Sequence, residues 1–265
     1  MHNCTLVVTT CKSYRDVFAE FRALFIKNWS ACPYLLYVVS DENIPDSSPF
    51  VSISSAGDWI SRLGNALSNI ESEFVLLLLD DYFIGTGLDL QELDRAINFV
   101  RVNDAKCLRL VNIPKVGGLP TEYLDISKIV TNQPYVLNLQ ASIWKKSFLQ
   151  EIIGTKEGSA WDFEVNLLHK YSLGCNFHDE SFYFYNRDVL NIKNAVIKGA
   201  WVPDINRYLA IGHNIKFNSH RKKMSLFEWM LYSCKSFLSA AIPLNMRRPI
   251  KSLLKIFGFK FYSDS

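Results

Sequence analysis

Two adjacent carboxylates, Asp80 and Asp81, directly follow the most apolar segment of the chain, residues 74–79. A continuous apolar run of this kind is typical of a parallel strand that is covered on both faces. Ligands of open α/β sheets bind at the carboxyl ends of the strands, where the strand order reverses. Two carboxylates at that position repel each other and lose hydration unless a cation or hydrogen bonds compensate.

A divalent cation would offset the repulsion and the lost hydration of these two carboxylates. Mg²⁺ and Mn²⁺ prefer oxygen ligands and are commonly held by one or two carboxylates together with substrate phosphates. We therefore expect Asp80 and Asp81 to bind such an ion and, through it, a diphosphate leaving group. The alternative is that one Asp caps the following turn while the other is solvated, and the pair alone does not separate the two readings.

The elements that would position this pair alternate along the chain. Hydrophobic periodicity predicts strands at 6–10, 35–39, 50–54, 74–79, 107–113 and 135–144, and helices at 16–28, 57–70, 90–100 and 162–171. Alternation of this kind predicts a Rossmann-like α/β domain with a central, mostly parallel sheet. We assign this domain to residues 1–215 and a basic, amphipathic, helical C-terminal extension to 216–265.

Composition narrows the functional classes. The six cysteines include no CxxC pair, which argues against a zinc site or a disulfide framework. The first residues lack a basic start followed by an apolar stretch, so no secretory signal is expected. No apolar run reaches the roughly 18 residues of a spanning helix. A net charge of +3 gives no reason to expect a nucleic-acid partner. We expect a cytoplasmic protein.

Four stretches resemble the GT-A glycosyltransferases, and within them the inverting family 2 type of bacterial surface-polysaccharide (O-antigen or capsule) synthesis. They are VVTTCKSYR (7–15), RLGNAL (62–67), FVLLLLDDYF (74–83) and WDFE (161–164) followed by Gly174. The resemblance implies an N-terminal nucleotide-binding half, a C-terminal acceptor half and a nucleotide-sugar donor. The family's metal motif is usually Asp-x-Asp, whereas here Asp80-Asp81-Tyr82 leaves either one coordinating Asp or a motif shifted by one residue.

The resemblance also implies which residues approach the nucleotide: Thr9, Thr10, Tyr14, Arg15, Asp41, Arg62 and Asp80. Arg62 would face the base or the phosphates, but a solvated helix face explains it equally well. Thr9 and Thr10 have the alternative of capping the first helix.

An inverting transfer needs a carboxylate that takes the proton of the acceptor hydroxyl. The family supplies it at the start of a helix, roughly ten residues before a glycine, and Asp162 and Glu164 both lie in that window before Gly174. Residues 159–162 also read as a capping box that occupies Asp162. We therefore favour Glu164 as the base and Asp162 as the cap. Trp161 is either a platform for an acceptor sugar or a packing residue.

The last part of the chain is basic. Residues 221–260 contain nine Lys or Arg and one acid, Glu228, interspersed with Trp, Phe and Leu. Segments of this composition lie in the plane of anionic membrane surfaces, which would bring the chain to a lipid-linked acceptor on the inner face of the plasma membrane. The competing interpretation is a pair of helices packed on the main domain or on a second subunit.

The sequence thus favours a metal-dependent glycosyltransferase that moves a sugar from a nucleotide-sugar to a lipid-linked glycan in surface polysaccharide synthesis. A nucleotidyltransferase that makes the sugar nucleotide is the alternative enzyme, but the loop at 9–13 lacks the glycines it would carry. A non-catalytic assembly protein that binds a nucleotide or glycan is the third reading.

Overall fold

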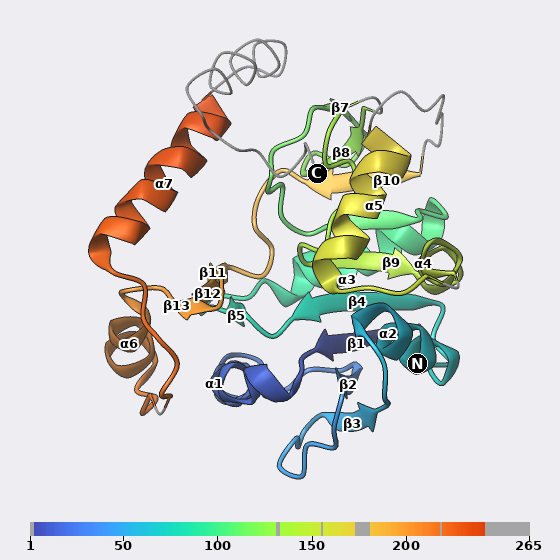
Figure 1. Ribbon diagram of the computed structural model, residues 1–265. Coiled ribbons are helices and arrows are strands. Elements are labelled where there is room, and N and C mark those ends of the chain that lie inside the picture. The colour runs from blue at the N-terminus through green and yellow to red at the C-terminus, as the bar shows by residue number, and fades with distance from the viewer. Residues whose placement is uncertain (1–2, 131–132, 155, 173–180, 218, 242–265) are drawn as a thin grey trace.

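The computed structural model describes residues 3–130, 133–154, 156–172, 181–217 and 219–241 (Figure 1). Its centre is a sheet of nine strands. In spatial order these are β3 (Val51–Ser54), β2 (Leu35–Ser40), β1 (Cys4–Thr9), β4 (Phe74–Leu79), β9 (Ser142–Lys145), β6 (Cys107–Arg109), β10 (Phe182–Tyr185), β8 (Ile126–Ile129) and β7 (Gly118–Pro120).

Most strands of this sheet run in the same direction. The four from β3 to β4 are mutually parallel. β9 runs antiparallel to both of its neighbours, β4 and β6, and β8 runs antiparallel to β10 and β7. Since β10 is parallel to β6, only β8 and β9 oppose the other seven strands. The predicted Rossmann-like α/β fold with a mostly parallel sheet is confirmed.

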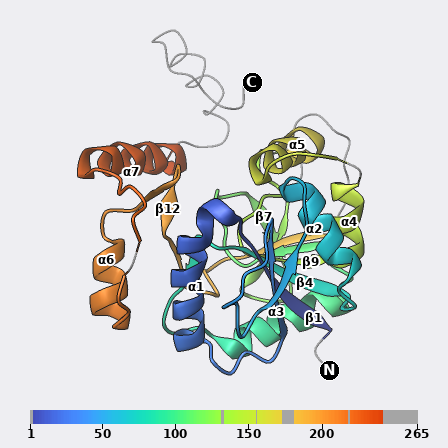
Figure 2. The same cartoon turned by 60° about the horizontal axis from the view of Figure 1, so that its bottom comes forward.

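Helices cover both faces of the sheet (Figure 2). On one face lie α1 (Arg15–Asn28) and α3 (Leu90–Val102), and on the other α2 (Trp59–Ser68), α4 (Lys146–Ile153) and α5 (Ala160–Ser172). Successive residues of a strand point to opposite faces, so Leu76 and Leu78 of β4 pack with the first group and Leu77 with the second. Burial on both faces explains why β4 has no polar residue.

Smaller elements lie on the side toward which β1 and β4 point (Figure 1). The structure has two short strand pairs there, β5 (Tyr82–Ile84) with β11 (Ile192–Asn194) and β12 (Val196–Ile197) with β13 (Ala200–Trp201). The short helices η1 (Lys12–Tyr14), α6 (Ile205–Arg207) and η2 (Tyr208–Gly212) and the longer α7 (Leu226–Ala241) complete the described elements.

Two predicted strands differ from the structure. The one predicted at 135–144 is a strand only at β9, and the one predicted at 107–113 ends at Arg109. Among the described residues, no helix is both long enough and apolar enough to cross a membrane. Gly174 and residues 242–265 of the predicted extension lie outside the described residues, and the domain boundary at 215 stays a prediction.

Candidate active site at the carboxyl ends of β1 and β4

The strand order reverses beside β1. From β1 the chain proceeds outward through β2 to β3 and then returns to place β4 on the other side of β1. A crevice opens at such a switch point, outside the carboxyl ends of the two central strands. The backbone continues the ladder one step further, because Asp80 N donates to Thr9 O (3.3 Å) and Thr10 N to Val39 O (2.9 Å). The structure therefore brings Thr9, Thr10 and Asp80 together.

Asp80 is buried and bonded to Thr10. The Thr10 hydroxyl donates to Asp80 Oδ2 at 2.5 Å. Burial and then the charge of Asp81 raise the pKa of Asp80 well above its ordinary value, against the lowering effect of Thr10. The capping alternative for the two threonines is wrong, since the N-caps of η1 and α1 are Cys11 and Tyr14, and neither forms a side-chain cap hydrogen bond. Thr9 Oγ1 is buried with no hydrogen-bond partner among the described residues.

Asp81 presents a carboxylate oxygen that no described residue satisfies. Its Oδ1 is buried and has no hydrogen-bond partner in the described part of the chain. Burial raises the pKa of Asp81 to about 7, and the charge of Glu164 adds to the shift. Its backbone is fixed by Ala195 N, which donates to Asp81 O at 2.9 Å. A buried acid without a partner is costly, and a cation that binds to it removes the cost.

These two carboxylates fit Mg²⁺ or Mn²⁺, both of which take oxygen ligands. The described residues contain no group of three or more His, Cys, Asp or Glu side chains that could hold a metal ion. The protein would thus contribute Asp80 and Asp81, and substrate phosphates and water would complete the coordination, as is usual for Mg²⁺.

Glu164 of α5 points inward to the same region. Leu139 N donates to Glu164 Oε1 at 2.8 Å. Burial raises the pKa of Glu164, while the hydrogen bond from Leu139 and the charge of Arg109 act in the opposite direction. Glu164 is therefore a partly buried carboxylate, held by one amide, whose charge reaches Asp81.

Arg109 is a buried cation whose charge acts on Glu164, and the sequence patterns assigned it no role. It is 0% exposed, and its two terminal nitrogens donate to Tyr135 O and Pro114 O, both at 2.9 Å. Burial lowers its pKa to about 10. The sequence does contain a signal for this residue, a single cation inside the apolar run at 107–111. Because arginine is almost never fully buried without a partner, such a cation indicates a buried arginine that is held by hydrogen bonds.

Asp162 forms the predicted capping box. Ser159 donates to Asp162 Oδ2 from its amide (2.8 Å) and from its hydroxyl (2.6 Å), and Asp162 N donates to Ser159 Oγ (3.2 Å). The hydrogen bonds from Ser159 lower the pKa of Asp162. Trp161, next to it, is 52% exposed and stands outside the two hydrophobic clusters.

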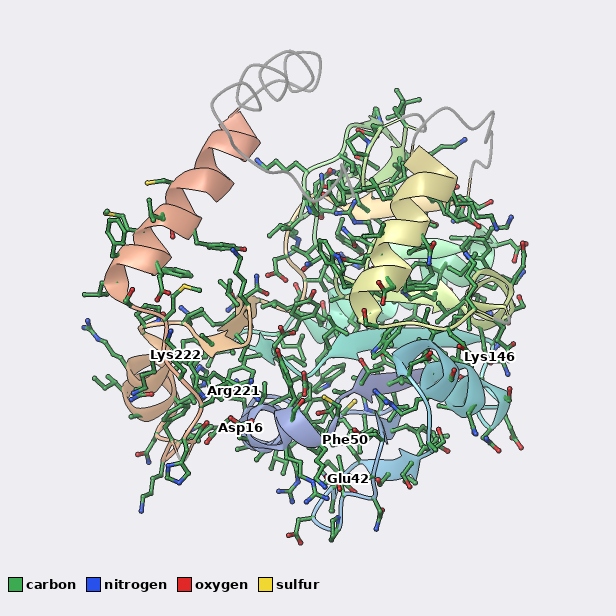
Figure 3. All side chains as sticks on the ribbon, viewed as in Figure 1. Asp16, Glu42, Phe50, Lys146, Arg221 and Lys222 are labelled. Carbon is green, nitrogen blue, oxygen red and sulfur yellow. The ribbon has the colours of Figure 1, made fainter. Side chains whose placement is uncertain are left out.

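A polar cluster joins the loop after β1 to the segment before α7. Asp16 accepts from Arg221 Nη2 (2.8 Å) and Nε (3.1 Å) and from the Ser219 hydroxyl (2.6 Å). The Arg221 guanidinium lies 4.2 Å from the centroid of the Tyr14 ring. Figure 3 shows Asp16 and Arg221 side by side, at a shallow cavity of about 470 Å³ lined also by Ser13, Ser219 and His220.

Tyr14 links this cluster to the acidic pair. Burial is the main cause that raises its pKa, and the charges of Asp81 and Asp80 add to the rise while Arg221 lowers it. Tyr14 is therefore within electrostatic reach of both the cation and the two carboxylates.

The other predicted nucleotide residues form a second group beside α2. Asp41 accepts from Lys12 N at 2.7 Å and from the Ser40 hydroxyl at 3.1 Å. Arg62 is only 9% exposed and donates to Gly57 O at 2.6 Å, so the solvated-face alternative is wrong. Burial tends to raise the pKa of Asp41, but these hydrogen bonds and the charge of Arg62 lower it.

Arg15 pairs with the loop after β2. Its Nε lies 2.7 Å from Glu42 Oε1, and its Nη2 donates to Asn43 O at 3.1 Å.

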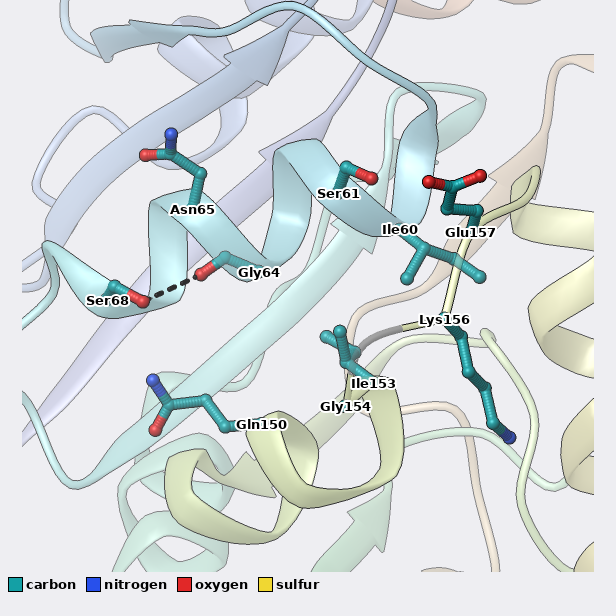
Figure 4. Close-up of a pocket in the computed structure, with 10 residues that line it drawn as sticks. All are labelled: Ile60, Ser61, Gly64, Asn65, Ser68, Gln150, Ile153, Gly154, Lys156 and Glu157. Carbon is teal, nitrogen blue, oxygen red and sulfur yellow. Dashed lines mark hydrogen bonds between the residues drawn. The ribbon is translucent and has the colours of Figure 1, made fainter.

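A second depression, of about 350 Å³, lies between α2 and α4 (Figure 4). Its lining is mostly small or polar and includes none of the predicted site residues: Ile60, Ser61, Gly64, Asn65, Ser68, Gln150, Ile153, Gly154, Lys156 and Glu157. This depression is therefore separate from the predicted site residues.

No protein-family model and no curated protein matches the chain. Among solved structures it is similar to residues 1–349 of TarS from S. aureus, with a TM-score of 0.40 and 17% identity over 68% of this chain and 59% of that chain. It is also similar to the bifunctional IspDF of Campylobacter jejuni, with a TM-score of 0.37 and 13% identity over 71% of this chain and 52% of that chain. A cytidylyltransferase of Leptospira borgpetersenii is similar with a TM-score of 0.38 and 12% identity over 99% of this chain and 100% of that chain. The chain thus matches less than two thirds of the TarS fragment and of IspDF, and no function follows from likenesses this distant.

Proposed function

We propose that this protein is a glycosyltransferase that moves a sugar from a nucleoside diphosphate to a glycan acceptor with inversion. The observation that supports it most directly is the acidic pair at the strand switch point, in which Asp81 Oδ1 is buried and has no partner among the residues that the structure describes. Asp80 and Asp81 are the residues that would hold Mg²⁺ or Mn²⁺ together with the diphosphate of the donor. When bound, the ion would supply positive charge that offsets the negative charge of the leaving diphosphate.

The nucleotide lies along the ends of β1 and β2 in this proposal. Thr10 orients Asp80, Tyr14 lies within electrostatic reach of the acidic pair, and Asp41 lies within that of Arg62 on α2. Thr9 offers a buried hydroxyl that has no partner in the described ranges of the chain and that a ligand would satisfy.

Glu164 is the proposed base. As the acceptor oxygen forms its bond to the anomeric carbon, the bond from that carbon to the diphosphate oxygen breaks, and Glu164 takes the hydroxyl proton. Burial favours proton uptake because it raises the pKa of this carboxyl, and Leu139 fixes its direction. The exposed face of Trp161, three residues earlier on α5, supports the acceptor sugar ring.

Ligand-dependent thermal stability tests this proposal. The protein is heated with nucleoside diphosphates, nucleotide-sugars and nucleoside triphosphates, with Mn²⁺ or with a chelator. A ligand at 100 times its dissociation constant adds roughly 2.7 kcal/mol to stability. We expect one diphosphate and its sugar conjugate to stabilise the wild type only with Mn²⁺, and to have no effect on Asp81→Asn.

Glu71→Gln is the matched control, because Glu71 is exposed and precedes the other end of the same strand. It should respond as the wild type does. Stabilisation by a triphosphate alone, with release of pyrophosphate when a sugar phosphate is added, would replace this proposal with a nucleotidyltransferase. Absence of any nucleotide effect would refute both enzyme assignments.

A further inference from the structure

Helix α7 carries an exposed apolar face. Leu226, Phe227, Met230 and Leu231 are 76%, 65%, 53% and 44% exposed. Spacings of three and four residues place these side chains on one side of a helix. Trp229 faces the body of the protein, where it packs against the larger hydrophobic cluster. Figures 1 and 2 show α7 set apart from the sheet and its covering helices, so this apolar face has no counterpart in the described part of the fold.

The position of α7 is tied to the candidate active site. Lys222 and Met224, immediately before the helix, bond to the backbone of Trp201. Trp201 N donates to Lys222 O (2.9 Å), and Met224 N donates to Trp201 O (2.8 Å). Trp201 is itself 0% exposed. Tyr232 of α7 also raises, by its charge, the pKa of Tyr82, the residue after Asp81, for which burial is the main cause. The apolar face is thus held on the side of the molecule toward which β1 and β4 point (Figure 1).

The positive charge beside α7 indicates what kind of partner its apolar face binds. Lys222 and Lys223 are exposed just before α7, and residues 221–260 hold nine Lys or Arg against the single acid Glu228. A second copy docked through the same face would bring the exposed Lys222 and Lys223 of both chains together, and juxtaposed like charges are costly. An anionic lipid surface matches both features, because its acyl region accepts apolar side chains and its head groups attract lysine.

We propose that the exposed face of α7, with Lys222 and Lys223, binds an anionic phospholipid surface. The helix lies in the interfacial plane, with Phe227 and Met230 below the head groups. If the proposed glycosyl transfer is correct, the surface then presents a lipid-linked acceptor to the crevice. The membrane-binding step itself requires no nucleotide, so it is tested separately.

Vesicle flotation of the full chain provides the test. The vesicles contain either phosphatidylcholine alone or phosphatidylcholine with phosphatidylglycerol. We expect the protein to float with the anionic vesicles and to stay in solution with the neutral ones. Binding should weaken between low and high salt, since lysine–head group attraction is screened over about 10 Å at 0.1 M ionic strength.

Two variants separate the apolar from the electrostatic contribution. Phe227→Ser with Met230→Ser should lower partitioning at least about tenfold, since both side chains bury apolar area in the bilayer. Lys222→Gln with Lys223→Gln should lower it by about tenfold or more on anionic vesicles. Leu124→Ser is the control, because Leu124 is 96% exposed but lies between β7 and β8. It should float as the wild type does.

The variants also distinguish the possible failures. Equal flotation of the wild type and the α7 variant, or no flotation of the wild type, overturns the proposal. A wild-type dimer that becomes a monomer in the α7 variant, measured by light scattering, assigns the face to a second copy instead. Nucleotide stabilisation that persists in the α7 variant shows that the fold is intact and that the nucleotide site stands independently of the membrane face.

Discussion

At the scale of single residues, the acidic pair lowers the stability of the protein in the same place where we propose that it binds a ligand. Asp80 and Asp81 are adjacent carboxyls, and burial raises the pKa of each. Thr10 satisfies an oxygen of Asp80, while Oδ1 of Asp81 has no partner in the described residues. Sites of this kind lower the stability of the empty protein and recover it when the ligand binds.

The first prediction concerns Asp81 and pH in the presence of a chelator. The folded-state pKa of Asp81 is about 7, against about 3.9 in an unfolded chain, so the folded state holds the extra proton between these values. Stability at this residue is full below about pH 4 and falls as pH rises through 7, by up to about 4 kcal/mol. Asp81→Asn should be the more stable protein at pH 8 in urea titrations. Equal pH dependence in variant and wild type would contradict this assignment.

The second prediction separates Glu164 from Asp162. Glu164→Gln keeps the shape of the side chain but cannot take a proton, so sugar transfer should fall by about 10²–10⁴ with unchanged donor binding. Asp162→Asn weakens the capping box with Ser159 and should lower thermal stability while transfer per folded molecule is retained. Single-turnover rates and melting curves for both variants give the comparison, and the opposite pattern would make Asp162 the base.

Sequence patterns identified some of these residues and not others. Asp80 and Asp81 follow a strand whose apolar run is continuous, so their place at the sheet edge could be predicted. Arg109 could not be assigned a role, because its partners are the backbone carbonyls of Pro114 and Tyr135, which lie in two separate connections and which no side-chain pattern reveals. The contact of Arg221 with Asp16 joins positions 205 residues apart and leaves no local signal.

At the scale of elements, apolar periodicity reports burial more directly than strand pairing. Val136, Leu137 and Leu139 are buried, as a strand would be, yet they precede β9 and belong to no ladder. The Asn138 side chain accepts locally from Gln140 N and donates to Ile113 O, which is 25 residues away. An Asn side chain that bonds to backbone groups competes with the pairing of strands. This competition explains why the strand predicted at 135–144 is shorter in the structure.

Gly158 joins the beginnings of α2 and α5. Its amide donates to Asp58 Oδ2 at 2.7 Å, and its carbonyl accepts from Ile60 N at 3.1 Å. Asp58 is the N-cap of α2, and Gly158 precedes the Ser159 capping box of α5. One residue thus sets the relative position of the helix that carries Arg62 and the helix that carries Glu164.

The third prediction is that Gly158→Ala destabilises the protein by more than about 1 kcal/mol. Gly158 has φ +143°, and an added Cβ would lie 2.9 Å from Asp162 Cβ. Gly87→Ala is the matched control: its φ is +77°, but an added Cβ has no heavy atom within 4 Å. Urea unfolding of both variants gives the two losses. A loss for Gly158→Ala no larger than that for Gly87→Ala would contradict a contribution from the contact with Asp162.

At the scale of the whole molecule, Arg221 connects the segment before α7 to the start of α1 through Asp16. The fourth prediction is a coupling of about 0.5–3 kcal/mol between Arg221→Ala and Asp16→Ala in a double-mutant cycle of urea unfolding. The hydrogen bonds from Arg221 and Ser219 lower the pKa of Asp16 despite its partial burial, so this coupling should be present at neutral pH and disappear as pH falls through that lowered pKa. Strict additivity at neutral pH would show that the contact contributes nothing.

The order of strands also sets the order in which the protein is completed during synthesis. β1 to β4 come from the first 79 residues and form one continuous half of the sheet. β10 enters between β6 and β8, both of which are made much earlier. Until residue 185 leaves the ribosome, these two strands present unpaired edges to each other and to neighbouring chains, and such edges promote aggregation. Slow translation or chaperone binding in this interval should therefore decide the yield of folded protein more than the stability of the finished sheet does.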